Sequence, residues 1–428
     1  MRRKPALCAF GVVIVWSGAL ASPAATQAAG HTNMVVSWNE IALSTFATAN
    51  VPPPAANRLG AIVQAAVFDA VNGFGQRYTP IHVEASGPED GSAAAAAAAA
   101  AHEALATLFP AQKTSLDAAL ATSIAGLADE EDAQSVAAGV DWGKTVADQV
   151  VAWRAADGFS SSPAPYVFNS SPGQWQATPG GTGPPTFRTL ATTMPFALTS
   201  PSQFRPVGPP ALTSARYAQD FNEVMALGGT TSTVRTPFQT ETAKFWQLDT
   251  PTAMWDRVAD SLASKRHANL LQTARLLALT NISIADATIA VFDAKNAFNS
   301  WRPVTAIAQA ATDGNPDTSP DPTWQPLLTT PYFQEYPSAH SGVSSAAAAV
   351  LTSFFGEDAA FTVTSAGLPG VTRSFTSFAE AVAQVADARV YAGFHFRFAC
   401  EDAMRMGEQV GAQVRGTLMQ RRSETDPN

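Results

Sequence analysis

The stretch RHANLLQTARLLALTNISIADATIAVFDAKNAFN, residues 266–299, decides the fold. Its apolar residues follow helical spacing almost without interruption, and apolar side chains cover most faces of the predicted helix. A helix that is apolar all round has to be buried by other elements. We therefore expect this helix at the centre of the fold, with other helices packed around it.

The rest of the chain has similar helical spacing, and no series of alternating apolar and polar residues predicts a sheet. Residues 157–210 and 311–337 are rich in Pro, Gly, Ser or Asp and predict long loops, and residues 356–373 predict a loop or a short hairpin. The expected fold class is all-α, a large helical bundle with long Pro- and Gly-rich loops. The other expected helices span residues 36–48, 56–74, 92–108, 112–127, 130–156, 213–227, 237–247, 251–264, 339–354 and 375–420, the last with an irregularity at Gly393.

The composition is that of a folded acidic protein. Of 428 residues, 46% are hydrophobic and 14% are charged, and the net charge is −9. Because no long basic run is present, nucleic acid is not an expected partner. Any anion site in this chain has to be assembled locally from a few cations.

The N-terminus has the layout of a secretory signal peptide. Arg2, Arg3 and Lys4 precede an apolar run at residues 6–16, and small residues follow. The run is too short to span a bilayer, although an uncleaved anchor is the alternative. We therefore expect a signal peptide at residues 1–29, a secreted or periplasmic mature chain, and no stable membrane span.

Two helical regions are expected behind the signal, an N-terminal one at residues 30–265 and one at residues 266–428 that carries the candidate site. Cys400 is then the one remaining cysteine, so neither an internal disulfide nor a cysteine-based zinc site can form. Four histidines have no partner at metal-ligand spacing and are expected at the surface or in the core: His31, His82, His102 and His267.

Lys295 and Arg302 form the first group of candidate site residues. They are seven residues apart, about two helical turns, so they would share one face of the central helix. Pro303 is expected to end that helix at Arg302. Taken alone, the pair fits two basic side chains in solvent equally well.

The second group is the sequence Glu-Tyr-Pro-Ser-Ala-His-Ser-Gly at residues 335–342. Ser338 is a natural N-cap for the helix that follows, and His340 lies in its first turn. Free N–H groups at a helix N-terminus favour an anion. An ordinary capped helix with a surface histidine would show the same residues.

Arg389 and His395 form the third group. On an unbroken helix their side chains would point about 120° apart. They converge only if the helix starts or breaks near Gly393, or if the arginine reaches around. A core histidine beside a surface arginine is the alternative.

Together these groups supply three cations, a helix N-terminus and two histidines. Three cations repel one another at one point unless an anion lies between them, and guanidinium groups match the oxygens of phosphate or vanadate. One histidine can attack or bond to the central atom, and the other can move protons. The residue set therefore suits chemistry at a tetrahedral oxyanion.

The pattern resembles the phosphatidic-acid-phosphatase type 2 (PAP2) superfamily, which includes the vanadium-dependent haloperoxidases and the bacterial class A acid phosphatases. The superfamily pattern is Lys-x6-Arg-Pro, then Pro-Ser-Gly-His, then Arg-x5-His. The phrases Asn-Ser-Trp-Arg-Pro-Val-Thr-Ala-Ile and Phe-Gln-Glu-Tyr-Pro-Ser-Ala-His-Ser, and Ser202-Gln-Phe-Arg-Pro206, resemble the bacterial haloperoxidase branch in particular. In this chain the pattern reads Lys295-x6-Arg302-Pro303, Pro337-Ser338-Ala339-His340 and Arg389-x5-His395.

The resemblance implies a role for each residue. His395 would be the axial ligand of vanadate, or the phosphorylated nucleophile of a phosphatase, and His340 would be the general acid–base. Lys295 would also polarise bound peroxide, and Phe333 lies where chloride-oxidising members have a phenylalanine. The implied oxyanion-binding residues are Lys295, Arg302, Ser338, Ala339 and Arg389.

The resemblance implies a vanadate-dependent enzyme that oxidises halide with hydrogen peroxide and halogenates a small organic acceptor. The alternative is an exported acid phosphatase that hydrolyses phosphate esters through phospho-His395. A non-catalytic oxyanion-binding protein is a third reading, and a homo-oligomer is compatible with each.

Two positions depart from the family pattern. Ala339 replaces the usual glycine, which keeps the backbone donor but adds a methyl group beside the anion. Ala399 stands where family members commonly place an aspartate that can orient the ligand histidine, so that group would be absent or come from elsewhere. Asp286 and Asp293, seven apart on the central helix, are candidates to balance the cations.

Overall fold

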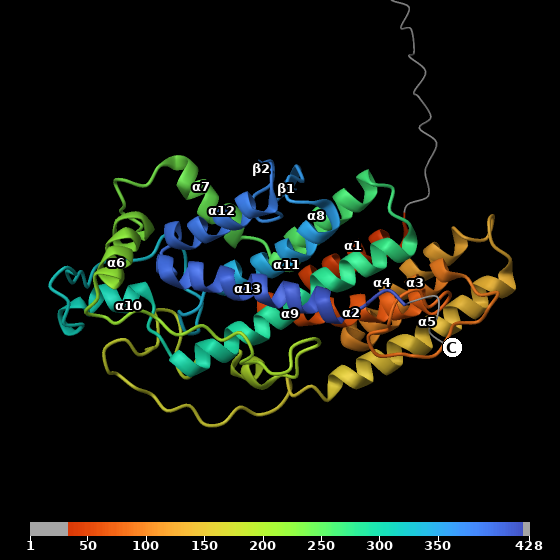
Figure 1. Ribbon diagram of the computed structural model, residues 1–428, viewed down its shortest axis with the longest axis horizontal. Helices are drawn as coiled ribbons and strands as arrows, with labels where there is room; N and C mark the ends of the chain where they lie inside the picture. Colours follow the sequence, from red (N-terminus) through yellow and green to blue (C-terminus); the bar gives the residue numbers. More distant parts are fainter. Residues whose placement is uncertain (1–32, 423–428) are drawn as a thin grey trace, which may run out of the picture. The chain divides into compact units, whose positions relative to one another are not determined.

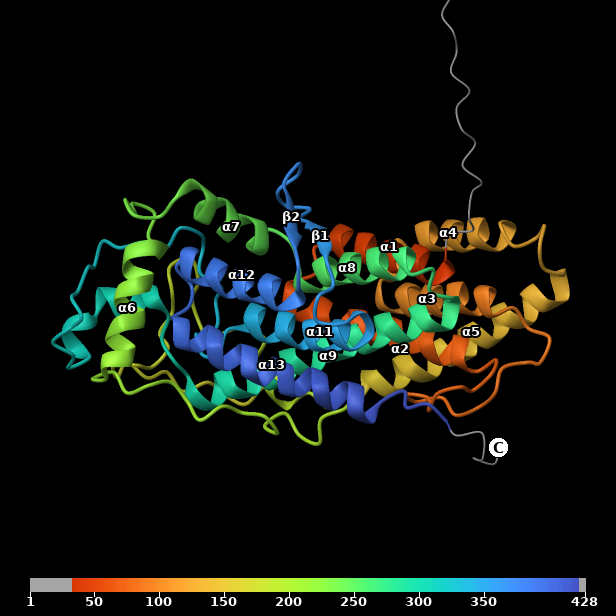
Figure 2. The same ribbon diagram turned by 45° about the horizontal axis from the view of Figure 1, so that its top comes forward.

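Helix α9 (Leu270–Phe298) lies at the centre of the fold, as its sequence predicts. It starts at a capping box between Asn269 and Gln272. It packs against α2 and α11 most extensively, and also against α13 and α8; Figures 1 and 2 show α9 and α11 side by side. Its length and composition would allow it to cross a bilayer, but the most apolar 18-residue window is 94% buried inside the protein. This is the burial expected of a core helix.

The computed structural model describes residues 33–422, and the expected signal peptide at residues 1–29 lies outside them. The division into regions 30–265 and 266–428 stays a prediction. Helices dominate the described residues (Figure 1), and the all-α class is confirmed. The other α-helices are α1 (Met34–Thr48), α2 (Pro53–Asn72), α3 (Ala93–Leu108), α4 (Lys113–Ala125), α5 (Ala133–Ala155), α6 (Ala215–Gly228), α7 (Pro237–Gln247), α8 (Pro251–Lys265), α10 (Pro303–Ala308), α11 (Ala339–Phe355), α12 (Phe378–Tyr391) and α13 (Arg397–Thr417).

A short antiparallel hairpin follows α11, within one of the two alternatives expected for residues 356–373. Its strands are β1 (Phe361–Thr364) and β2 (Thr372–Phe375). Phe361 pairs directly with Phe375, and both side chains are buried. The hairpin therefore joins the core through alternate residues, as a half-buried ribbon should.

Helices α11 and α13 form the closest helix pair of the second half, and small residues make this approach feasible. A Cβ atom at Gly407 of α13 would clash with the carbonyl oxygen of Gly342 in α11. The second group of candidate residues lies at the start of α11, and His395 of the third group lies two residues before the start of α13. The tight packing of the two helices therefore places His395 next to the second group.

The central helix ends earlier than its sequence predicts. It stops at Phe298, with Asn299 at φ +49° as its C-cap, and Pro303 then begins α10. Asparagine tolerates this left-handed conformation, and proline is favoured as the first residue of a helix. The prediction that Lys295 and Arg302 share one helix face is therefore wrong, and a turn brings them together instead.

The long loop at residues 157–210 is fastened to α9. Asp286 accepts hydrogen bonds from the backbone N–H groups of residues 196–198 at 2.7–3.1 Å. Asp293 forms a two-bond ion pair with Arg205, with both distances at 2.7 Å. The prediction that these aspartates balance the site cations is wrong, because both are engaged by the loop.

Candidate active site

The break at Gly393 lets Arg389 and His395 converge. Helix α12 ends at Tyr391, α13 begins at Arg397, and His395 lies in the turn between them. Gly393 has φ +81°, and a Cβ there would lie 2.6 Å from the carbonyl oxygen of Gly228. Glycine is therefore required for both its conformation and its lack of a side chain. The sequence predicted that Arg389 and His395 would converge if the helix broke near Gly393, and the helix does break there.

The structure brings all three groups of predicted residues to one buried place. His395 experiences the charges of Arg302, Lys295 and Arg389, and the ring of His340 also lies within electrostatic range. Lys295, Arg302, Arg389 and His395 are almost fully buried, whereas His340 is partly exposed. We call the three basic side chains Lys295, Arg302 and Arg389 the cationic cradle.

The two ring nitrogens of His395 have different partners. Nδ1 lies 2.9 Å from Oε1 of Glu335, and Nε2 lies 3.1 Å from Nη1 of Arg302. Arginine can only donate, so Nε2 accepts and the proton resides on Nδ1, which donates to Glu335. The lone pair of Nε2 therefore faces the cradle, where it can bond to the central atom of an oxyanion.

The cradle residues are held by neutral oxygen atoms rather than by carboxylates. No ion pair with a carboxylate therefore neutralises them within residues 33–422, although Glu335 lies within electrostatic range of Lys295 and Arg302. The bonds are Lys295 Nζ to the carbonyl oxygens of Gln334 and Glu335 (2.7 and 2.8 Å), Arg302 to the carbonyl oxygens of Phe333 and Phe394 (2.8 and 3.0 Å), and Arg389 Nη1 to Oε1 of Gln247 (2.7 Å).

The cradle has unmet hydrogen-bonding capacity. Nη2 of Arg302, Nε of Arg389 and Nε2 of His340 are buried and have no partner. Burial lowers the pKa of Arg302 to about 10 and that of Arg389 to about 9, and it lowers the pKa of Lys295 far below its ordinary value. Buried donors without acceptors and buried like charges are both costly. A tetrahedral oxyanion would relieve both costs, so the residues fit vanadate or phosphate.

The N-terminus of α11 borders the cradle. Ser338 is the N-cap, as predicted, but its side chain makes no capping bond, and its Oγ lies 3.0 Å from Oγ of Ser341. The N–H groups of the first turn, beginning with Ala339, therefore have no side-chain cap and favour an anion. Burial, followed by the charges of the cradle, lowers the pKa of His340 far below its ordinary value, so its imidazole is neutral.

Phe333 forms an apolar wall of the cradle. The centre of its ring lies 5.3 Å from Nζ of Lys295 and 5.0 Å from the guanidinium carbon of Arg302. Phe187 of the long loop contacts the same ring edge-on, with the ring centres 6.4 Å apart. The loop thus contributes directly to the surroundings of the site.

Glu335 is the functional residue that the sequence analysis missed. It is fully buried, and burial raises its pKa to about 8, against the lowering effect of Lys295 and Arg302. Nothing in its spacing predicted a contact with a histidine sixty residues later. The one available signal was its position immediately before the Tyr-Pro-Ser-Ala-His motif.

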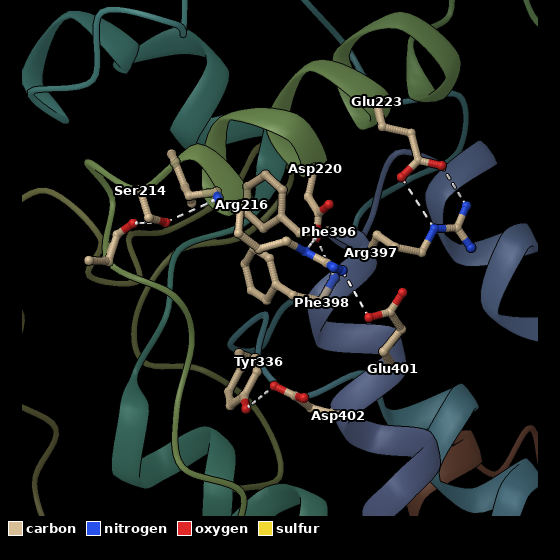
Figure 3. Close-up of polar contacts among 12 residues, drawn as sticks. Ser214, Arg216, Asp220, Glu223, Tyr336, Phe396, Arg397, Phe398, Glu401 and Asp402 are labelled. Atoms are coloured by element: carbon tan, nitrogen blue, oxygen red, sulfur yellow. Dashed lines mark hydrogen bonds and ion pairs between the residues drawn. The ribbon is translucent and has the colours of Figure 1, made fainter.

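The acidic residues that follow His395 are bonded to other residues, and Figure 3 shows these partners. Glu401 pairs with Arg216 of α6 at 2.8 Å, and Asp402 accepts a bond of 2.6 Å from the hydroxyl of Tyr336. Arg397 is held by Glu223 at 2.6 Å. These contacts fix the start of α13 against α6 but leave the orientation of His395 to other groups.

Cys400 lies beside this site in the first turns of α13. It is fully buried and forms no disulfide. Burial raises the pKa of its thiol to about 12, although the hydroxyls of Ser341 and Ser338 oppose that rise. The side chain is therefore a neutral thiol packed under the cradle.

The remaining histidines within residues 33–422 are outside the site. His82 stacks on Trp153, and His102 bonds to Asp117 at 2.8 Å. His31 lies outside the described residues. Across the described part of the chain, no group of three or more His, Cys, Asp or Glu side chains is arranged to hold a metal ion.

The second half of the chain matches a known family. Residues 275–424 fit the model of the VCPO second helical-bundle domain. Vanadium chloroperoxidase from Curvularia inaequalis is 30% identical over 166 residues, and the match covers 31% of this chain and 27% of that protein. The match thus spans only about a quarter of the curated relative.

Solved structures extend the similarity to nearly the whole chain. The first bacterial vanadium-dependent iodoperoxidase is similar at a TM-score of 0.78 and 27% identity, covering 92% of this chain and 98% of that one. A holo-type bacterial vanadium-dependent chloroperoxidase has the same fold at a TM-score of 0.67 and 16% identity, covering 85% of this chain and 91% of that one.

Proposed function

We propose that this chain is an enzyme that oxidises halide with hydrogen peroxide at a vanadate held by His395. Its fold and its C-terminal helical bundle are those of the vanadium-dependent haloperoxidases. One observation carries the proposal. His395 Nε2 accepts from Arg302, and the three buried cations around it form no ion pair with a carboxylate within residues 33–422. This arrangement is preorganised for a multiply charged oxyanion.

Each residue has a part that follows from its contacts. The cradle would hold the oxygens of bound vanadate, with the hydroxyl of Ser338 and the N–H of Ala339 as further donors. Bound vanadate supplies a centre at which hydrogen peroxide becomes electrophilic toward halide. Two hydrogens of the Lys295 ammonium are engaged by backbone carbonyls, so the third is free to polarise a peroxide oxygen.

His340 is placed to move the protons of the reaction. It is neutral and partly exposed at the edge of the cradle, and its Nε2 has no partner within the described residues. A neutral imidazole can take a proton from peroxide and later release it to water. Phe333 and Phe187 form an apolar flank along which a weakly hydrated halide can approach.

The test uses one purified sample of the chain. Formation of hypohalous acid from hydrogen peroxide is measured separately with chloride, bromide and iodide, with and without vanadate. Hydrolysis of a phosphate monoester is measured on the same sample, because an acid phosphatase is the alternative; the relatives named above do not favour it. Vanadate-dependent halide oxidation supports the proposal, and phosphate turnover without any halide oxidation overturns it.

Export of the chain is a separate part of the proposal. The basic residues 2–4 and the apolar run at residues 6–16 support a cleaved signal and a secreted or periplasmic enzyme. N-terminal sequencing of the protein recovered outside the cytoplasm tests this. An intact N-terminus in the membrane fraction would contradict it. That the enzyme halogenates a small organic molecule and that it forms a homo-oligomer remain predictions.

A further inference from the structure

The start of α13 lacks a capping side chain of its own. Phe396 is the N-cap, and its side chain offers no acceptor. The backbone N–H of Phe396 instead donates to Oε1 of Glu335 at 3.1 Å. The same oxygen accepts the Nδ1–H of His395 at 2.9 Å. One buried oxygen thus serves both the helix terminus and the histidine that precedes it.

Glu335 takes the role that an acceptor side chain at position 399 would have. In a capping box, the residue three positions after the N-cap turns its side chain back to accept the N-cap N–H. In α13 that residue is Ala399, which has no acceptor and is fully buried. Glu335 therefore occupies the place that a carboxylate at position 399 would take. It arrives from the segment before α11 rather than from α13 itself.

The segment that carries Glu335 is docked firmly on its surroundings. The N–H of Glu335 donates to the carbonyl oxygen of Ser300 at 3.0 Å, and the N–H of Ser338 donates to the carbonyl oxygen of Ala399 at 3.0 Å. These bonds anchor the backbone of the segment, and the carboxyl group itself is held by the N–H groups of Phe396 and His395. A histidine bonded to it is oriented with little freedom.

Nearby carboxylates do not share this task. Asp220 accepts the N–H of Phe398 at 2.7 Å and pairs with Arg216 (Figure 3), whereas Glu401 and Asp402 are engaged as described above. Within residues 33–422, the ion pair of His395 is with Glu335. Asp220 is thus a buried carboxylate at the same helix start that does not contact the histidine, which makes it a matched control.

We propose that Glu335 is the positioning residue of His395. It caps α13 from a distant segment and keeps the imidazole in the Nδ1–H form, with the Nε2 lone pair turned toward the cradle. The effect on vanadate rests on the proposed function. The orientation of the histidine does not, because it is a property of the vanadate-free protein.

The first experiment therefore needs no vanadate. In protein labelled with ¹⁵N at histidine, the Nδ1–H of His395 is expected as a slowly exchanging signal, assigned by its loss in His395→Ala. The signal should be lost in Glu335→Ala and retained in Asp220→Asn. If Glu335→Ala does not fold, Glu335→Leu of similar volume takes its place. An unchanged His395 signal in the folded Glu335 variant overturns the proposal.

The second experiment measures vanadate affinity by calorimetry. Removing the partner of a metal-bound histidine typically weakens binding about 10- to 100-fold, which is the loss expected for Glu335→Ala. Glu335→Gln keeps an acceptor oxygen and should lose less, and Asp220→Asn should bind like the parent. Partial recovery of affinity in Glu335→Ala/Ala399→Asp supports the proposal. If the parent binds vanadate and Glu335→Ala binds it equally well, Glu335 does not position His395. If the parent binds no vanadate, the proposed function is wrong, and the first experiment alone decides how His395 is oriented.

Discussion

The cationic cradle and the buried acids of α8 are two charged regions that the fold treats in opposite ways. Asp256 and Asp260 lie in the core between α8 and its neighbours, bonded to the amides of Asn281 and Asn39 at 2.8 and 2.7 Å rather than to cations. Burial raises the pKa of both, that of Asp260 to about 7. A carboxylate without a counter-charge can become neutral by taking up a proton.

Arginine has no comparable escape, because its guanidinium group stays protonated in proteins. Arg302 and Arg389 remain charged even though burial lowers the pKa of each. Because the cradle forms no direct ion pair within residues 33–422, an external anion is the group that would neutralise it best. The comparison teaches that unpaired buried acids indicate a structural region, whereas unpaired buried arginines indicate a ligand.

The largest effect should follow from breaking the cradle. Arg302→Ala removes a preorganised donor from the oxyanion, and one such donor is typically worth about 10²- to 10³-fold in turnover. We expect a loss of that size in kcat/KM for vanadate-dependent bromide oxidation. Asp260→Asn, a change in the other region, is the control and should keep its activity. Equal losses of activity in both variants would contradict the distinction between a ligand-binding cradle and a structural acidic region.

The second effect is stabilisation by the anion. A ligand that binds only the folded state at 100 times its dissociation constant adds about 2.7 kcal/mol to the free energy of unfolding. Vanadate should therefore raise the Tm of the parent and of Asp260→Asn, but not that of Arg302→Ala. Thermal unfolding followed by circular dichroism measures this. A rise in all three proteins would place the anion elsewhere.

The third effect is a pH dependence of stability that comes from the buried acids of α8. The pKa of Asp260 rises from its ordinary 3.8 to about 7 on folding, so the folded protein keeps a proton that the unfolded chain loses. The stabilisation is present below about pH 4 and is lost as the pH rises to about 7. Asp260→Asn should remove a pH-dependent change on the order of 1–3 kcal/mol. Urea unfolding of both proteins at pH 5 and pH 8 tests it, and parallel pH dependences would contradict it.

The smallest effect concerns Asp286, a third buried carboxylate. Three backbone N–H groups lie against it, and its pKa is about 6 because burial outweighs those bonds. Asp286→Asn keeps one acceptor oxygen and should cost about 1 kcal/mol. Hydrogen exchange at residues 196–198 should accelerate while the rest of α9 is unchanged. No change at those residues would show that the loop is held by other contacts.

The sequence predicted most of the fold because the signals are local. The central position of α9 followed from apolar residues on most of its faces, and the break in the last helical region followed from Gly393. The end of α9 was mispredicted because the left-handed turn at Asn299 competes with a continuous helical pattern. A single asparagine gives too weak a signal to decide that competition from sequence.

The residues of the candidate site were likewise predictable only where the signal is local. The motif residues, among them Lys295 and His395, were found because their types and spacing have a chemical meaning. Glu335 and the loop contact of Asp286 depend on tertiary packing between segments far apart in the chain. No periodicity encodes such contacts, so they appear only when the helices are placed.

The burial of Cys400 has a consequence for the lifetime of the enzyme under the proposed function, in which hypohalous acid is released. A thiol reacts with oxidants mainly as thiolate, and this one is neutral and closed off from solvent. Product that diffuses away therefore meets no reactive sulfhydryl on the described surface. The side chain of Met194, 52% exposed on the long loop, is where self-inflicted sulfoxidation should first be detected by mass spectrometry of spent enzyme.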